Sequence, residues 1–126
     1  MNAPYDRSYS PPLPTVEIVL RLPEGDSVGP LRAVIDTGAD ATIIPTSTLA
    51  KLPIRPLHSG FLRSAWGERR PIDLYLLDVQ VAGLTLPGVE IVGDELGHEL
   101  ILGRNVLNKL ILLLDGPALT TTVSSR

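Results

Sequence analysis

The chain contains no cysteine, which excludes disulfides, iron–sulfur clusters and thiol nucleophiles. Aromatic residues are only 4% of its 126 residues, so we expect a core of leucine, isoleucine and valine. No apolar run approaches the roughly 18 residues of a membrane span. The formal net charge of −3 argues against nucleic acid as the main partner. We therefore expect one cytoplasmic domain, with neither a nucleic-acid nor a membrane partner.

Proline and polar residues dominate positions 1–13, which we predict to form a flexible N-terminal arm. Short apolar segments follow, with frequent glycine and proline turns between them. This pattern is typical of an all-β domain, predicted here over residues 14–117, with residues 118–126 as a C-terminal strand or tail. A short helix is predicted over 104–110, and the segment 46–52 permits a second helical turn.

One tripeptide, Asp36-Thr37-Gly38, lies between two apolar segments, residues 33–35 and 41–44. A carboxylate among hydrophobic strands is costly to bury unless it is hydrogen-bonded, and a glycine turn can direct backbone amides at it. The alternative is an ordinary surface turn, because aspartate and glycine are common turn residues. The apolar segments on both sides favour a functional turn, since ordinary turns lie at a solvated surface.

Hydrolysis of a peptide bond by aspartate needs two carboxyl groups, one to deprotonate water and one to protonate the carbonyl oxygen. The Asp-Thr-Gly tripeptide occurs once, because Asp115-Gly116 lacks the threonine. A two-fold axis would place Asp36 opposite its symmetry mate, and two-fold dimers are the commonest oligomers. Thr37 could then donate its hydroxyl across the axis, and Gly38 would let the backbone approach a substrate.

A second motif, Ile101-Leu102-Gly103-Arg104-Asn105, follows later in the chain. Together with Asp-Thr-Gly-Ala-Asp at 36–40, it resembles the retropepsin-like aspartic proteases, that is, the retroviral proteases and their single-domain cellular relatives. The resemblance covers roughly residues 14–116. It implies a small closed β-barrel with a short C-terminal helix, and a homodimeric endopeptidase that cleaves an extended peptide or protein substrate without metal or cofactor.

The resemblance also implies roles for individual residues. Asp36 would be the catalytic aspartate, supported by Thr37 and Gly38. Arg104 would form a structural ion pair with Asp40, because a guanidinium offers two donors to a carboxylate; the alternative is an exposed helix residue. The substrate-binding residues would be Ala39, Asp40, Ile43, Ser64, Ala65, Trp66, Gly67 and Ile101.

A predicted hairpin over residues 60–70 lies where the family has its flap, and the tail 118–126 would lie at the dimer interface. The hairpin tip has a single glycine, Gly67, and Trp66 is either a lid residue or an exposed tip residue. This departure supports the alternative of a non-catalytic dimeric peptide-binding or assembly module of the same fold. A monomeric ligand-binding barrel is a third option. His58 and His98 stand alone, so no metal site is expected.

Overall fold

The structure is a computed structural model that describes residues 1–63 and 67–125. Short strands dominate it, which confirms the all-β prediction. The strands are β1 (Asn2–Pro4), β2 (Thr15–Arg21), β3 (Ser27–Ile35), β4 (Thr42–Pro45), β5 (His58–Arg63), β6 (Arg69–Val81), β7 (Leu84–Asp94), β8 (Leu100–Leu102), β9 (Ile111–Asp115) and β10 (Thr120–Ser124). The helices are α1 (Thr46–Leu49) and α2 (Arg104–Leu107).

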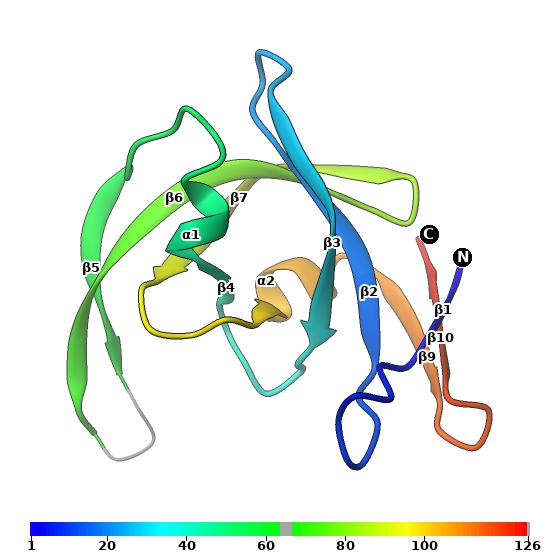
Figure 1. The fold of residues 1–126 in the computed structure, drawn as a ribbon. Coiled ribbons are helices and arrows are strands. Elements are labelled where there is room, and N and C mark those ends of the chain that lie inside the picture. The colour runs from blue at the N-terminus through cyan, green and yellow to red at the C-terminus, as the bar shows by residue number, and fades with distance from the viewer. Residues whose placement is uncertain (64–66, 126) are drawn as a thin grey trace.

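A closed six-stranded barrel forms the body of the molecule (Figure 1). Its strands follow the order β2-β3-β8-β4-β7-β6, and an antiparallel pairing between β6 and β2 closes the ring. The three-residue strand β8 lies between β3, with which it is parallel, and β4. Within the described residues, β5 pairs with β6 alone, so these two strands extend from the barrel as a hairpin.

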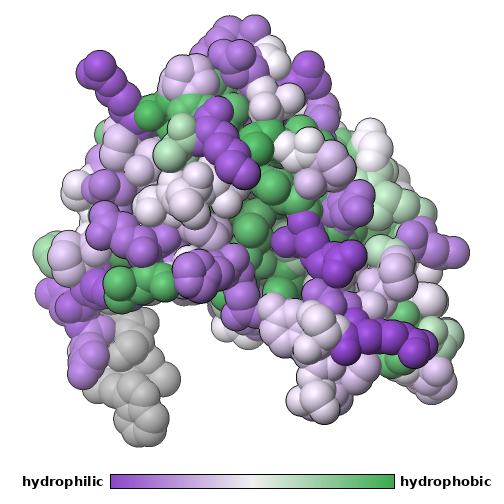
Figure 2. Space-filling view, in the orientation of Figure 1, coloured by the Kyte–Doolittle hydropathy of each residue, from purple (hydrophilic) through white to green (hydrophobic). Residues whose placement is uncertain are grey.

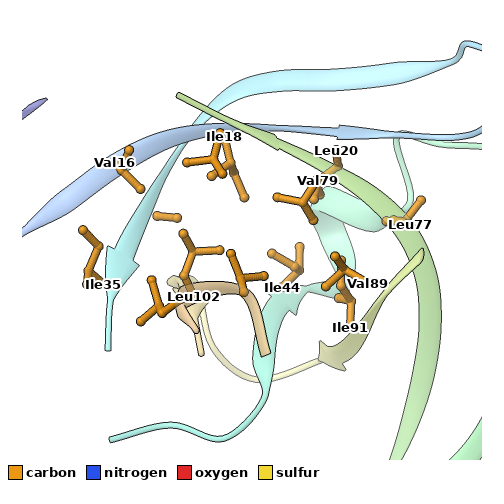
Figure 3. Packing of buried hydrophobic residues seen from close by; sticks show 14 of the residues in the cluster. Val16, Ile18, Leu20, Ile35, Ile44, Leu77, Val79, Val89, Ile91 and Leu102 are labelled. Carbon is orange, nitrogen blue, oxygen red and sulfur yellow. The ribbon is translucent and has the colours of Figure 1, made fainter. Parts of the chain in front are cut away.

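The interior of the barrel is filled by aliphatic side chains that point inwards from the strands (Figure 3). Successive side chains of a strand lie on opposite faces, so alternate residues of each strand reach this interior. The buried cluster in the described residues contains alanine, valine, leucine and isoleucine but no aromatic residue, which confirms the expected aliphatic core. Its members with 1% exposure or less include Ile18, Leu20, Ile44, Leu77, Val79, Ile91, Leu102 and Val106.

A second, three-stranded sheet with the order β1-β10-β9 lies beside the barrel. The expected flexible arm at residues 1–13 therefore contains a strand in this structure, and β1 pairs antiparallel with β10. The amino group of Met1 donates a hydrogen bond to the Val123 carbonyl, at 3.1 Å. The Tyr9 hydroxyl donates to the Glu99 carboxylate, just before β8. The sequence pattern predicted neither contact, because both join residues far apart in the chain.

The helix α2 is shorter than the predicted helix over 104–110. It ends at Leu107, and the amides of Lys109 and Leu110 donate to carbonyls three residues earlier, at Val106 and Leu107. Such bonds form tight turns that end a helix. The chain must turn here because β9 begins at the next residue. None of the helices in the described part of the chain has the length and apolar character to cross a bilayer.

The burial of Leu102 and the exposure of Leu57 predict that their substitutions change the stability by very different amounts. Leu102→Ala should lower the free energy of unfolding by about 2–5 kcal/mol, because Leu102 is fully buried and the substitution leaves a cavity. Leu57→Ala is the matched control: Leu57 is 58% exposed, and its loss should cost less than about 0.5 kcal/mol. Urea unfolding followed by circular dichroism measures both, and equal effects would contradict this description of the core.

Candidate active site

The loop of residues 36–41 joins β3 to β4 and points towards the lower side of the view in Figure 1. Its first backbone amide, at Asp36, donates to the Leu102 carbonyl at the end of β8, at 3.1 Å. The amide of Ala39 then donates to the Asp36 carbonyl, at 3.2 Å, which closes a turn. The turn that carries Asp36 is thus fixed to a barrel strand at its base.

The Asp36 carboxylate accepts a hydrogen bond from the backbone amide of Gly38, at 2.9 Å. A Cβ atom at Gly38 would lie 3.2 Å from the same carboxylate oxygen, tighter than most real contacts, so glycine lets the amide approach. Asp36 is partly buried, whereas Thr37 and Gly38 are exposed. The backbone therefore orients one carboxylate oxygen, and the outer side of the loop is uncovered in the single chain.

Helix α2 holds this loop through backbone carbonyls. The amide of Arg104 donates to the Ala39 carbonyl, and the Arg104 guanidinium donates to the Thr37 carbonyl, both at 2.8 Å. The expected ion pair between Arg104 and Asp40 is not formed, although the structure describes both residues. Asp40 is exposed, so such a pair would contribute little, whereas the bond to the Thr37 carbonyl ties the helix directly to the turn that carries Asp36.

A buried network of hydrogen bonds lies next to this loop. Its residues received no role from the sequence. Thr42 is fully buried, and its hydroxyl donates to the Asn105 side-chain oxygen, at 2.7 Å. The same hydroxyl accepts the Gly103 amide, at 3.2 Å, and the Asn105 amide group donates to the Glu90 carbonyl, at 2.9 Å. Buried polar groups of this kind stabilise only when satisfied. The signal in the sequence was the Gly-Arg-Asn motif itself, whose asparagine received no assignment.

Gly103 packs directly against the backbone of Ala41. A Cβ atom at this position would lie 2.2 Å from the Ala41 carbonyl oxygen and 2.4 Å from its carbonyl carbon. No side chain fits there without displacing the backbone of the loop. The glycine therefore sets how closely α2 can pack against the loop that carries Asp36.

Two of the predicted substrate-binding residues meet beside this loop. Ile43 on β4 is the register partner of Ile101 on β8, and both are half-buried. Ala39 is half-buried, and Asp40 is exposed on the loop itself. The structure brings these four residues to one region around Asp36.

The remaining predicted substrate-binding residues fall in the sequence between β5 and β6. The strands of the β5–β6 hairpin, 58–63 and 69–81, agree with the hairpin expected over 60–70. Gly67 is exposed, with a positive φ of 82° and open space around it. Ser64, Ala65 and Trp66 lie outside the described residues. In the part of the chain that the structure describes, no group of three or more histidine and acidic side chains is arranged to hold a metal ion.

Comparison with known proteins gives one family. The model of the family described as gag-polyprotein putative aspartyl protease matches residues 26–109. The matched segment contains both the loop with Asp36 and the β8–α2 junction that supports it. No curated protein matches the chain.

The close approach at Gly103 predicts a specific sensitivity. Gly103→Ala should lower the free energy of unfolding by about 2 kcal/mol or more, because the new methyl group collides with the Ala41 backbone. Gly116→Ala is the control, since a Cβ atom at Gly116 meets no atom within 4 Å. Thermal and urea unfolding of both variants provide the measurement. A Gly103→Ala protein as stable as the Gly116→Ala protein would refute the packing argument.

Proposed function

Because the chain belongs to the gag-polyprotein aspartyl protease family, which its model matches over residues 26–109, we propose that it is an aspartic endopeptidase active as a homodimer. The observation that carries the proposal is the Asp36 carboxylate, held by the Gly38 amide on a loop anchored to β8 and α2. Each chain supplies one such aspartate, and hydrolysis requires two. The second is the Asp36 of the partner, related by a two-fold axis.

The chemistry follows from one proton shared by the two carboxyl groups, which cannot both ionise at short distance. The ionised Asp36 takes a proton from water, and the water oxygen attacks the scissile carbonyl carbon. The protonated Asp36 of the partner gives its proton to the carbonyl oxygen, and a tetrahedral diol results. The diol then collapses. One of its hydroxyls gives a proton to the ionised carboxylate of the pair, and the protonated carboxyl group gives its proton to the departing nitrogen as the carbon–nitrogen bond breaks.

The other residues around the loop are assigned by their position. Thr37, exposed beside Asp36, donates across the axis to the opposite loop. Ile43 and Ile101 form an apolar wall for substrate side chains, with Ala39 and Asp40 nearer the catalytic group. The β5–β6 hairpin covers the bound peptide. An extended peptide suits this arrangement because it exposes alternate side chains to both walls.

The dimer requires a surface that two copies can share. The strand β9 is at one edge of the three-stranded sheet, and its Leu113 and Leu114 are 62% and 44% exposed. Figure 1 places the β9–β10 turn on the same lower side as the loop with Asp36, and Figure 2 shows a small hydrophobic area there among hydrophilic residues. An edge strand with exposed leucines invites pairing with another copy. We therefore propose that β9 forms the dimer interface, with the C-terminal strand β10 beside it.

The catalytic assignment predicts that Asp36→Asn abolishes cleavage of a mixed peptide library, because an amide cannot deprotonate water. The dimer should persist, as light scattering would show. Asp26→Asn, in the exposed turn between β2 and β3, is the matched control and should cleave like the wild type. Cleavage retained by Asp36→Asn would end the proposal. Binding of peptides without cleavage by the wild type would instead favour the non-catalytic peptide-binding module.

The proposed interface predicts that Leu113→Asp converts the dimer to monomer, since two buried charges would face each other across the axis. Leu57→Asp, at a leucine 58% exposed just before β5, is the control and should remain dimeric. Sedimentation velocity measures the mass, circular dichroism checks the fold, and activity per chain should fall with the dimer. A monomeric wild type, or a Leu113→Asp protein that stays dimeric and active, would contradict this interface.

A further inference from the structure

A cavity of about 390 Å³ lies between the β5–β6 hairpin and the residues that follow β7. Three parts of the chain meet there: the start of α1, the base of the hairpin and the beginning of the β7–β8 connection. The residues that matter for its chemistry are Thr46, Ser59, Ile72, Asp73, Glu95 and Leu96. The sequence motifs gave none of them a function.

The position of the cavity relates it to Asp36. The strand β4 begins directly after the catalytic loop, and Thr46, which lines the cavity, follows its last residue. Four residues of strand span about 13 Å, and an extended peptide advances by the same distance in about four residues. A peptide that lies along β4 with its scissile bond at Asp36 thus reaches the cavity about four residues from the cut.

The other wall of the cavity offers backbone groups to a peptide. Ser59 lies on β5, the edge strand of the seven-stranded sheet, and lines the cavity. An edge strand presents unpaired amide and carbonyl groups that an extended peptide can pair with. A side chain of such a peptide, at the right register, points into the space beside Ser59.

The lining combines apolar surface with uncompensated negative charge. Ile72 is half-buried, and Leu96 is 75% exposed at the cavity rim. The Arg70 guanidinium also lines the cavity, but it pairs with Asp94 at 3.7 Å. In the described part of the chain, neither Asp73 nor Glu95 has an ion-pair partner.

The carboxylates of Asp73 and Glu95 come from different parts of the chain, yet both influence the same tyrosine, Tyr75. Asp73 on β6 accepts the Ser59 hydroxyl, at 3.1 Å. The pKa of the Tyr75 phenol is raised above its usual value, first by burial and then by the charges of Asp73 and Glu95. Both carboxylates thus act on one side chain, and both line the cavity.

We propose that this cavity is a subsite for a lysine or arginine side chain of the substrate, about four residues from the cleaved bond. The aliphatic stem of the side chain packs on Ile72 and Leu96, and its cationic end lies between Asp73 and Glu95. A long basic side chain meets both surfaces at once, whereas an apolar one leaves the carboxylates unpaired and an acidic one is repelled. The proposal rests on the proposed function, because it places the peptide relative to Asp36.

The test uses fluorogenic peptides in which one lysine is moved along the sequence, each compared with the same peptide carrying norleucine. Norleucine keeps the aliphatic stem and removes the charge. The wild type should show a kcat/KM ratio of about five- to tenfold in favour of lysine at one position. This ratio should fall as sodium chloride is added, because salt screens partly exposed charges.

Variants assign the preference to the cavity. Glu95→Gln should reduce the lysine-to-norleucine ratio, and Glu95→Lys should invert the choice in favour of glutamate at the same position. Glu24→Gln, which removes an exposed carboxylate from the turn after β2, should leave the ratio unchanged. A ratio that does not respond to either Glu95 variant, or a wild type with no positional preference for basic residues, would overturn the subsite.

A second readout separates this proposal from the proposed function. Fluorescence anisotropy of the same peptides with the Asp36→Asn protein measures binding without turnover, and it should show the same preference for lysine. A wild type that binds lysine peptides selectively but cleaves none would overturn the proteolytic function and retain the subsite. Equal binding of lysine and norleucine peptides would overturn the subsite whether or not cleavage occurs.

Discussion

The candidate site depends on one close contact, the packing of Gly103 against the backbone of Ala41. The distance that a Cβ atom would have to the Ala41 carbonyl oxygen, 2.2 Å, leaves no room for any side chain. Because the two backbones meet, the amide of Arg104 reaches the Ala39 carbonyl and its guanidinium reaches the Thr37 carbonyl. These two hydrogen bonds hold the loop at Thr37 and at Ala39, although the loop itself has no regular secondary structure. Its rigidity is what an aspartate needs if it is to meet a symmetry mate at a fixed distance.

The buried hydroxyl of Thr42 adds to this constraint. It lies between the Gly103 amide and the Asn105 side chain, and Asn105 in turn bonds to the Glu90 carbonyl on β7. A polar group in an aliphatic interior is costly unless each of its bonds is made, so the network favours a single arrangement of β4, β7 and α2. The aliphatic core provides most of the burial, but the polar network determines where the loop lies on it.

Local patterns in the sequence predicted what is local in the structure. Alternating apolar residues indicated the strands of the barrel, and Asp36-Thr37-Gly38 indicated the turn at the end of β3, with the hairpin near its observed bounds. Features that depend on pairing across the chain were missed: the three-stranded sheet of β1, β10 and β9, and the Thr42–Asn105 network. The partner of Arg104 was also wrong, since the resemblance suggested Asp40 and the structure gives the Thr37 carbonyl. Every residue carries a backbone carbonyl, so the residue types alone did not single out Thr37 as the acceptor for Arg104.

The long strand β6 pairs with three strands along its length. Its residues from Leu74 onwards pair with β7, and residues 78–81 also pair with β2 and so close the barrel. Its first residues, 69–74, pair with β5 outside the barrel. Every ladder bond of the outer part is therefore internal to the hairpin, and none contributes to closing the ring. Substitutions, insertions or deletions in the outer hairpin therefore remove none of the backbone hydrogen bonds that close the barrel. The hairpin side of the proposed cleft can thus vary in sequence and length independently of the ring of strands that carries Asp36.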